Sequence, residues 1–181
     1  AGKGTQAAII GEHYGIPAIS TGNIFRLAIT NRTKLGERIK RIIADGGYVP
    51  DSLSVQVVVD RLKEEDAKGG WLLDGFPRTL GQVQALDEEL DAHGFTLKAV
   101  VSLTADEDAI VDRMLKRAEI EGRPDDNEET IRHRMEVYHE QTDPLLDVYR
   151  TRGLLIEVDG MGTVDEVSQR VLGALAERLG R

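Results

Sequence analysis

The chain opens on a short run whose residue types suit phosphate binding. Ala1-Gly2-Lys3-Gly4-Thr5 follows the second half of the G-x-x-x-x-G-K-[ST] pattern, with Gly4 in the hydroxyl position. Glycines let backbone N–H groups approach phosphate oxygens, and a lysine there can neutralise β- and γ-phosphates. The run fits half of a phosphate-binding loop, and equally a Gly-Lys pair with no such role. If it is such a loop, we expect an apolar strand and a Gly-rich turn before Ala1.

A second candidate follows an apolar pair in the run Leu72-Leu73-Asp74-Gly75-Phe76-Pro77-Arg78. A carboxylate at the end of a buried parallel strand lies where ligands bind in open sheets, and it suits Mg²⁺ held through water. Arg78 offers a planar fork for a phosphate. The alternative is a turn aspartate and a surface arginine.

Arginines recur between residues 113 and 134: Arg113, Arg117, Arg123, Arg132 and Arg134. Arg113 and Arg117 are four residues apart on an expected helix, so they share a face and repel each other unless an anion joins them. An anion site is therefore one interpretation, and a solvated, salt-bridged surface is the other.

Composition narrows the function classes. With 181 residues, 40% of them hydrophobic, the chain suits one domain with a sizeable core. A net charge of −9 and a pI of about 5.0 argue against non-specific binding to nucleic acid or anionic membranes. No cysteine is present, which removes disulfides and thiolate zinc sites and is compatible with a cytoplasmic location. No apolar run approaches the roughly 20 residues of a membrane span.

The elements that must position these residues alternate between strand and helix. Buried strands are predicted at 16–20, 71–73, 97–103 and 154–160, with helices between them. Capping boxes are predicted at Thr104/Glu107 and Thr163/Glu166, Pro144 should kink or break a helix over 128–150, and 118–127 should be a loop. The alternation predicts an α/β fold with a parallel sheet flanked by helices on both faces.

Together these segments resemble adenylate kinases, members of the nucleoside monophosphate kinase family. The matching runs are GKGTQ at 2–6, ISTGNIFR at 19–26, LLDGFPRT at 72–79 with Gln82, DRMLKR at 112–117, GRPDDNEETIRHRM at 122–135 and VDG at 158–160. They follow the family's order and cover essentially the whole chain. The resemblance implies a P-loop NTPase-like fold and reversible phosphoryl transfer from Mg-ATP to AMP, giving two ADP and serving adenine nucleotide homeostasis.

The resemblance also implies a role for each matching position. The ATP-binding residues would be Ala1, Gly2, Lys3, Gly4, Thr5, Arg113, Arg117 and Gly162, with Arg113 over the adenine. The AMP-binding residues would be Thr21, Arg26, Gly47, Tyr48, Val49, Gly75, Phe76, Pro77, Arg78, Gln82, Arg123 and Arg134. Catalysis would depend on Lys3, Arg78, Arg117, Arg123 and Arg134, and Asp74 would order water around Mg²⁺.

One domain is expected, with a core of residues 1–19, 50–117 and 128–181. A helical NMP-binding insertion at about 20–49 would close over AMP, and a short lid at about 118–127 would close over ATP. The lid AEIEGRPDDN is far shorter than in many bacterial relatives, so the chain resembles a short-lid form without zinc. Asn23 stands where the family often has aspartate. The protein is expected to be a monomer that binds no nucleic acid and no membrane.

Two alternatives remain open. One is a UMP- or CMP-type kinase, although Thr21 and Gln82 favour adenine. The other is a nucleotide-binding protein without catalysis, because half of the phosphate loop pattern is missing.

Overall fold

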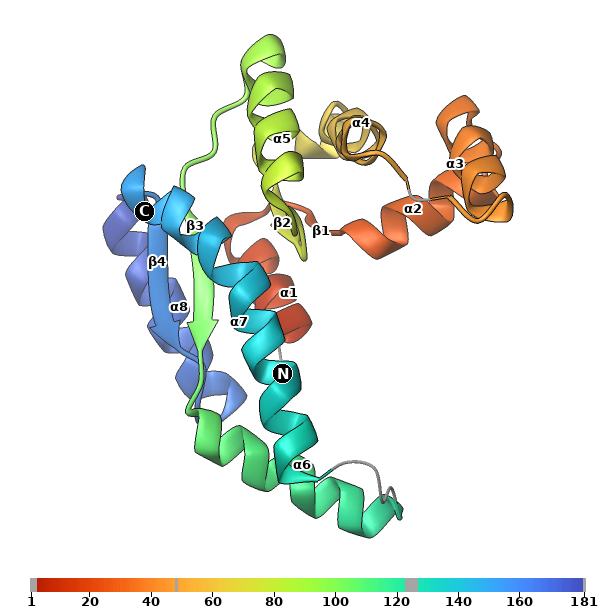
Figure 1. Cartoon of the computed structure of the whole chain (residues 1–181). Coiled ribbons are helices and arrows are strands. Elements are labelled where there is room, and N and C mark those ends of the chain that lie inside the picture. The colour runs from red at the N-terminus through yellow and green to blue at the C-terminus, as the bar shows by residue number, and fades with distance from the viewer. Residues whose placement is uncertain (1–2, 48, 123–126, 181) are drawn as a thin grey trace. The chain divides into compact units, whose positions relative to one another are not determined.

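The computed structural model describes residues 3–47, 49–122 and 127–180 of the chain (Figure 1). These residues form two compact units, Ala1–Leu97 and Lys98–Arg181, which are described separately below. In this described part, no helix combines the length and the apolar character needed to span a membrane.

The first unit contains one short parallel strand pair and five α-helices among its described residues. Its elements are α1 (Lys3–Tyr14), β1 (Ala18–Ser20), α2 (Thr21–Thr30), α3 (Lys34–Ala44), α4 (Asp51–Leu62), a 3-10 turn (Glu65–Ala67), β2 (Leu72–Asp74) and α5 (Leu80–His93). Strands β1 and β2 pair in parallel, with Ser20 opposite Asp74. Both strands therefore present their carboxyl ends at one edge, as the predicted parallel sheet requires.

The core of this unit forms around α4. Its Val55, Val58 and Leu62 are buried, and they cluster with Ile19 of β1 and Leu86 of α5. Each such side chain contributes about 1.5–3 kcal/mol by leaving water. Helix α4 is apolar on more than one face because α5 and α2 both pack against it. Helix α4 therefore supports both α2 and α5, and with them the start of α2 and the loop before α5.

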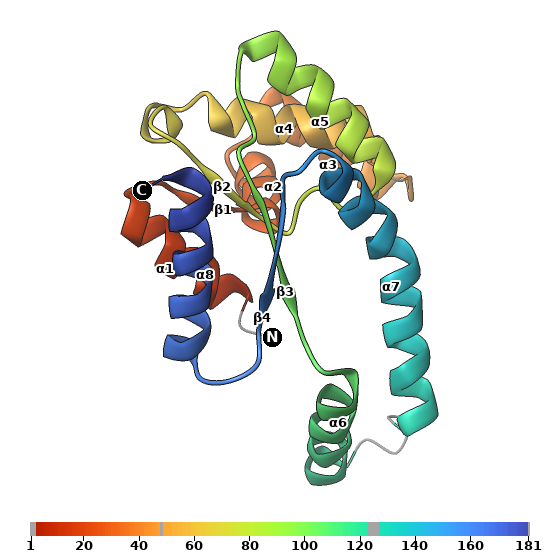
Figure 2. The same ribbon diagram turned by 90° about the vertical axis from the view of Figure 1, so that its left-hand side faces the viewer.

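The second unit is built on a longer parallel pair. Its elements are β3 (Val100–Thr104), α6 (Glu107–Glu121), α7 (Glu128–Thr151), β4 (Leu155–Asp159) and α8 (Val164–Leu179). Strands β3 and β4 pair in parallel from Val100 opposite Leu155 to Thr104 opposite Asp159. Figure 2 shows the two strands side by side, with α8 packed along β4. Val171 of α8 is fully buried in this packing.

Helix ends follow the predicted caps in one place and depart from them in another. Thr163 and Glu166 form the predicted capping box of α8. Thr79, which was not predicted as a cap, accepts from the Gln82 backbone N–H and caps α5. The predicted box of Thr104 and Glu107 is wrong. Thr104 is the last residue of β3 and its hydroxyl donates to Val158 O, so Asp106 caps α6 instead.

Two further expectations about the second unit need correction. Helix α7 runs unbroken from Glu128 to Thr151 with Pro144 inside it, so the proline does not break the helix. The predicted loop at 118–127 is shorter, because residues 118–121 belong to α6 and Gly122 ends that helix with φ 66°. Asn127 caps α7, and residues 123–126 lie outside the described part.

Candidate functional site

Gly75 lies at the centre of the candidate site in the first unit. A Cβ atom added to it would lie 3.2 Å from Arg78 Nη2, 3.5 Å from Lys3 Nζ and 3.8 Å from Thr21 Oγ1. A guanidinium, an ammonium and a hydroxyl from three separate segments therefore surround one backbone position. The φ of Gly75 is 85°, a left-handed conformation that favours glycine. The structure thus brings together four residues that the sequence predicted for one site.

Asp74 adds a carboxylate to this group. It ends β2, and its Oδ1 lies 3.2 Å from Lys3 Nζ in an ion pair whose aspartate side is far more buried than its lysine side. Oδ1 is nevertheless without an aligned hydrogen bond. The ammonium is close enough for attraction but not oriented as a donor, so the carboxylate keeps acceptor capacity for another ligand. A Cβ at Gly4 would lie 3.8 Å from Asp74 Oδ2, an ordinary contact distance, so Gly4 is next to this carboxylate.

The loop after β2 fixes the Arg78 side chain. Its Nε donates to Gly75 O over 2.8 Å, and its backbone N–H donates to Gln82 Oε1 over 2.8 Å. The Phe76–Pro77 peptide bond in this loop is cis. The Gln82 side chain therefore acts as an acceptor toward the loop, and no hydrogen bond of its Nε2 occurs among the described residues. That nitrogen remains a donor for a ligand.

Asp51 joins this site, although the sequence did not predict it. Its Oδ1 accepts a long hydrogen bond of 3.4 Å from Thr79 Oγ1, and a Cβ at Gly81 would lie only 2.1 Å from its Oδ2. Asp51 begins α4, directly after the predicted AMP-binding residues 47–49. It thus ties that segment to the cap of α5. The sequence signal for this contact was Gly81, a residue without a side chain two places after the Thr79 cap.

The remaining predicted AMP contacts of the first unit are more dispersed. Arg26 is exposed on α2 and its Nη2 donates to Asn23 Oδ1, so Asn23 holds an arginine rather than capping the helix. Gly47 is exposed, and Val49 packs against the core. Ala1, Gly2, Tyr48 and Arg123 lie outside the described residues.

The second unit carries the other predicted arginines on two helices. Arg113 and Arg117 are exposed on α6, and in the described part of the chain neither side chain has a hydrogen-bond or ion-pair partner. Arg134 is exposed on α7. Arg132 is committed elsewhere, because hydrogen bonds to Asp108 and Glu128 raise its pKa above the ordinary value. The resemblance to adenylate kinases likewise assigned no ligand contact to Arg132.

Gly162 lies in the loop between β4 and α8, with φ 117°. The loop follows the carboxyl end of β4, the edge where ligands bind in parallel sheets. Across the described residues, no group of three or more His, Cys, Asp or Glu side chains is arranged to hold a metal ion.

A lysine, a strand-terminal carboxylate and a fixed arginine gather around a left-handed glycine at the carboxyl end of a parallel strand, which is where α/β proteins bind their ligands. A family model described as adenylate kinase matches residues 1–154. An adenylate kinase of Leifsonia xyli subsp. xyli (strain CTCB07) is 60% identical over 178 residues, which cover 98% of this chain and 89% of the relative. The chain belongs to the adenylate kinase family.

Other relatives agree over the same length. An adenylate kinase of Clavibacter michiganensis subsp. michiganensis (strain NCPPB 382) is 57% identical over 98% of this chain and 89% of its own length. One of Kocuria rhizophila is 53% identical over 97% of this chain and 93% of its own. The resemblance predicted from the sequence is thereby confirmed.

Proposed function

We propose that this chain transfers a phosphoryl group reversibly from ATP to AMP and so forms two ADP. The observation that carries the proposal is the convergence of Lys3, Thr21 and Arg78 around Gly75, with Asp74 beside them. Relatives named adenylate kinase, alike over nearly the whole chain, support the same reaction. Nothing in the comparisons favours the UMP/CMP kinase or the non-catalytic binder.

The residues act mainly by placement and by charge. Phosphoryl transfer needs little covalent help from the protein, so in-line positioning and neutralisation of charge supply most of the rate. Lys3 and the amides of Gly2, Gly4 and Thr5 would hold the ATP phosphates. Arg78, Arg117, Arg123 and Arg134 would surround the transferring group with permanent positive charge.

A magnesium ion fits the carboxylate in the first unit. Mg²⁺ keeps several of its waters and binds through one or two carboxylates together with substrate phosphates. Asp74 supplies one carboxylate, whose buried Oδ1 lacks an aligned hydrogen bond. Asp74 would hold the ion through water, and the ion would neutralise phosphate charge. Gly4 supports the indirect contact, because no hydroxyl is present at the position that often binds the metal directly.

Recognition of the adenine base of AMP, the phosphoryl acceptor, would depend on Thr21 and Gln82. Thr21 is 6% exposed and its hydroxyl faces Gly75, while the fixed Gln82 carboxamide leaves its nitrogen as a donor. Arg26, Gly47, Val49 and Gly75 would complete the AMP contacts. Segments 20–49 and 118–127 would close over AMP and ATP and exclude water, since water would otherwise take the phosphoryl group.

A coupled assay for ADP formation tests the proposal, run on the protein with any residues that precede Ala1 in its gene. AMP should be the fastest acceptor, with UMP and CMP at least about tenfold slower in kcat/KM. Faster turnover of UMP or CMP would assign the pyrimidine alternative. Nucleotide binding by calorimetry without any ADP formation would assign the non-catalytic one.

Arg78→Ala provides the residue-level test. Loss of a positioned charge at the transferring group should lower kcat/KM about 10²–10³-fold. Arg152→Ala is the matched control, because Arg152 lies 5.6 Å over the Tyr149 ring and outside every predicted contact. Similar kinetics for the two variants would remove Arg78 from the site. A monomeric, cytoplasmic enzyme stays a prediction, and light scattering after size-exclusion chromatography tests the first part.

A further inference from the structure

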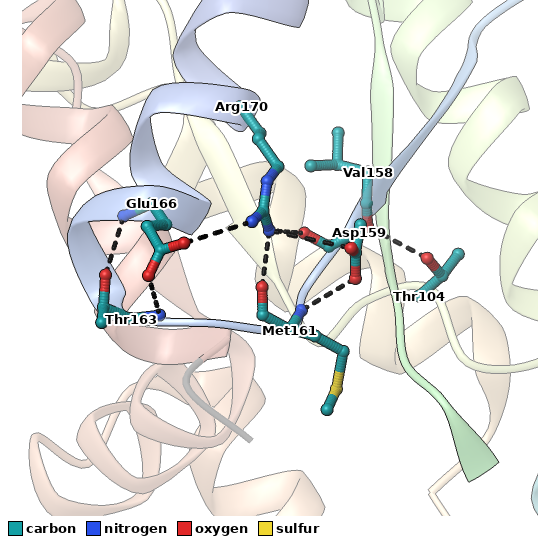
Figure 3. A network of polar contacts seen from close by, with 7 residues as sticks. All are labelled: Thr104, Val158, Asp159, Met161, Thr163, Glu166 and Arg170. Carbon is teal, nitrogen blue, oxygen red and sulfur yellow. Dashed lines mark hydrogen bonds and ion pairs between the residues drawn. The ribbon is translucent and has the colours of Figure 1, made fainter. Parts of the chain in front are cut away.

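Hydrogen bonds hold several backbone groups of the loop from Asp159 to Thr163, and Figure 3 shows those at Asp159, Met161 and Thr163. The Gly160 N–H donates to Thr104 O at 2.7 Å, and the Met161 N–H donates to Asp159 Oδ1 at 2.9 Å. The Thr163 N–H donates to Glu166 Oε1 at 3.2 Å within the capping box of α8. Three backbone donors of a short loop, those of Gly160, Met161 and Thr163, are thus engaged, although the loop contains two glycines.

The carbonyl groups of the loop converge on one side chain. Arg170 Nη1 donates to Asp159 O at 2.9 Å and to Met161 O at 2.6 Å, so it bridges the backbone on both sides of Gly160. Figure 3 shows its guanidinium between the strand end and the start of α8. A Cβ at Gly162 would lie 3.4 Å from Arg170 Nη2, so the next part of the loop also packs against this group.

The charge of Arg170 is already compensated within the protein. Its nitrogens lie 3.9 Å from Asp159 Oδ2 and 3.8 Å from Glu166 Oε2, in addition to the two carbonyl contacts. The two carboxylates offset the charge of the guanidinium, and both hydrogen bonds of its Nη1 go to backbone carbonyls of the loop. Arg170 therefore differs from Arg113 and Arg117, which have no partners among the described residues.

We propose that Arg170 is a positioning residue for the phosphoryl donor: it fixes the backbone of residues 159–162 so that Gly162 can contact ATP. This inference rests on the proposed function, because Gly162 is an ATP contact only by resemblance. The physical reason is that two backbone carbonyls bound to one charged group lose the freedom to rotate their peptide planes. A ligand then meets a loop that is already ordered and need not supply that ordering free energy.

Steady-state kinetics on Arg170→Ala and Arg178→Ala test the proposal. Arg178 is the matched control, since it lies on the same helix and donates to the Gly153 carbonyl, away from the loop. Arg170→Ala should raise KM for ATP about fivefold to tenfold, the effect of losing one or two charge-assisted hydrogen bonds. KM for AMP and kcat should stay within about twofold. Arg178→Ala should leave both KM values unchanged.

Hydrogen exchange provides a readout that does not depend on activity. The amides of Gly160, Met161 and Thr163 should exchange about tenfold faster or more in Arg170→Ala, and at the original rate in Arg178→Ala. If alanine at 170 prevents folding, Arg170→Gln keeps a polar stem and takes its place. Equal KM for ATP in the two variants, or unchanged exchange of the loop amides, overturns the proposal.

The proposal and the proposed function fail in different ways. If the unaltered protein forms no ADP from ATP and AMP, the proposed function fails. In that case the role of Arg170 is still tested by the hydrogen-exchange rates of the loop amides. Calorimetry with ATP tests it as well, because the Arg170→Ala protein should bind ATP several-fold more weakly than the Arg178→Ala protein. An active unaltered protein whose Arg170→Ala variant keeps its KM for ATP refutes Arg170 alone.

Discussion

Three side chains predicted to bind nucleotide lie close together because Gly75 has no side chain between them. Lys3, Thr21 and Arg78 all lie within 4 Å of the place where a Cβ would stand. The left-handed backbone at φ 85° turns the Gly75 carbonyl to accept from Arg78 Nε. A glycine therefore does two tasks here, since it leaves room for the cations and also orients one of them.

Gly75→Ala should damage activity more than stability. The left-handed backbone costs an alanine about 1–2 kcal/mol, and the added methyl would displace Arg78 or Lys3. A misplacement of this size at a phosphoryl-transfer site should lower kcat/KM about 10²-fold. Urea unfolding and the coupled assay measure the two effects.

Gly69→Ala is the matched control, because it has open space around its Cβ position and no positive φ. Its stability should stay within about 0.5 kcal/mol and its rate unchanged. An active Gly75→Ala enzyme would show that the cations tolerate a methyl group between them.

At the scale of elements, the close packing of α2 on α3 depends on one glycine. A Cβ at Gly36 would lie 2.0 Å from the Ala28 carbonyl oxygen, a contact that no side chain can make. Both helices belong to the predicted NMP-binding insertion. Gly36→Ala should lower the free energy of unfolding by about 1–3 kcal/mol, because the helices must separate.

Gly173→Ala provides the comparison for this change. Gly173 is inside α8 with nothing near its Cβ position, so alanine should stabilise the protein by about 0.5–1 kcal/mol through helix propensity. Denaturant midpoints with equal m-values would compare the two variants. Equal, small effects of both would mean that α2 and α3 do not need this close approach.

The capping box of α8 makes its stability depend on pH. The Thr163 backbone N–H lowers the pKa of Glu166 below its ordinary value of 4.5. The ionised carboxylate thus stabilises the fold above about pH 4.5, and this contribution is lost as the pH falls through the lowered value. Glu166→Gln should reduce the melting temperature at pH 7, and the difference from the unaltered protein should shrink below pH 4.

Glu177→Gln controls for the loss of a negative charge on the same helix. Glu177 is exposed near the far end of α8 and has no part in the cap. Its replacement should produce no comparable pH-dependent difference in melting temperature. A Glu166→Gln difference that persists unchanged at pH 3 would assign its effect to packing and not to the charged cap.

Local chemistry made most of these elements predictable from the sequence. Thr163 and Glu166 marked the start of α8 by their spacing, and the structure has that capping box. Thr104 failed because strand pairing to Asp159 took it into β3. Of the predicted kink or break at Pro144, the break does not occur, because buried Leu145 and Tyr149 hold the following turns of α7 in place.

The candidate site was predictable where a motif names its residues. Asp74 and Arg78 followed from a strand end and its loop, and the structure brings them beside Lys3. Asp51 and Arg170 were missed because their roles are tertiary. Asp51 meets a hydroxyl 28 residues away in the sequence, and Arg170 meets carbonyls of the loop before its own helix. Only the folded backbone shows which of these groups each side chain meets.

At the scale of the whole molecule, a chain with a negative net charge is expected to bind negatively charged nucleotides through a few positive side chains that lie close together. The net charge is −9, yet Lys3 and Arg78 surround one glycine in the first unit. The general field repels polyanions, and fixed cations at short range still attract a small phosphate. Selectivity for mononucleotides over nucleic acid is therefore expected from charge distribution alone.

Binding of AMP should raise the melting temperature of the whole protein. A ligand present at about 100 times its Kd stabilises the folded state by about 2.7 kcal/mol, which for a chain of this size corresponds to about 5–10 °C. AMP and ATP should each produce such a shift in differential scanning fluorimetry, whereas UMP and CMP at the same concentration should shift it by less than about 2 °C. Arg78→Ala should lose most of the AMP shift while Arg152→Ala keeps it, because only Arg78 is fixed beside Gly75. A UMP or CMP shift as large as that of AMP would contradict the role given to Thr21 and Gln82.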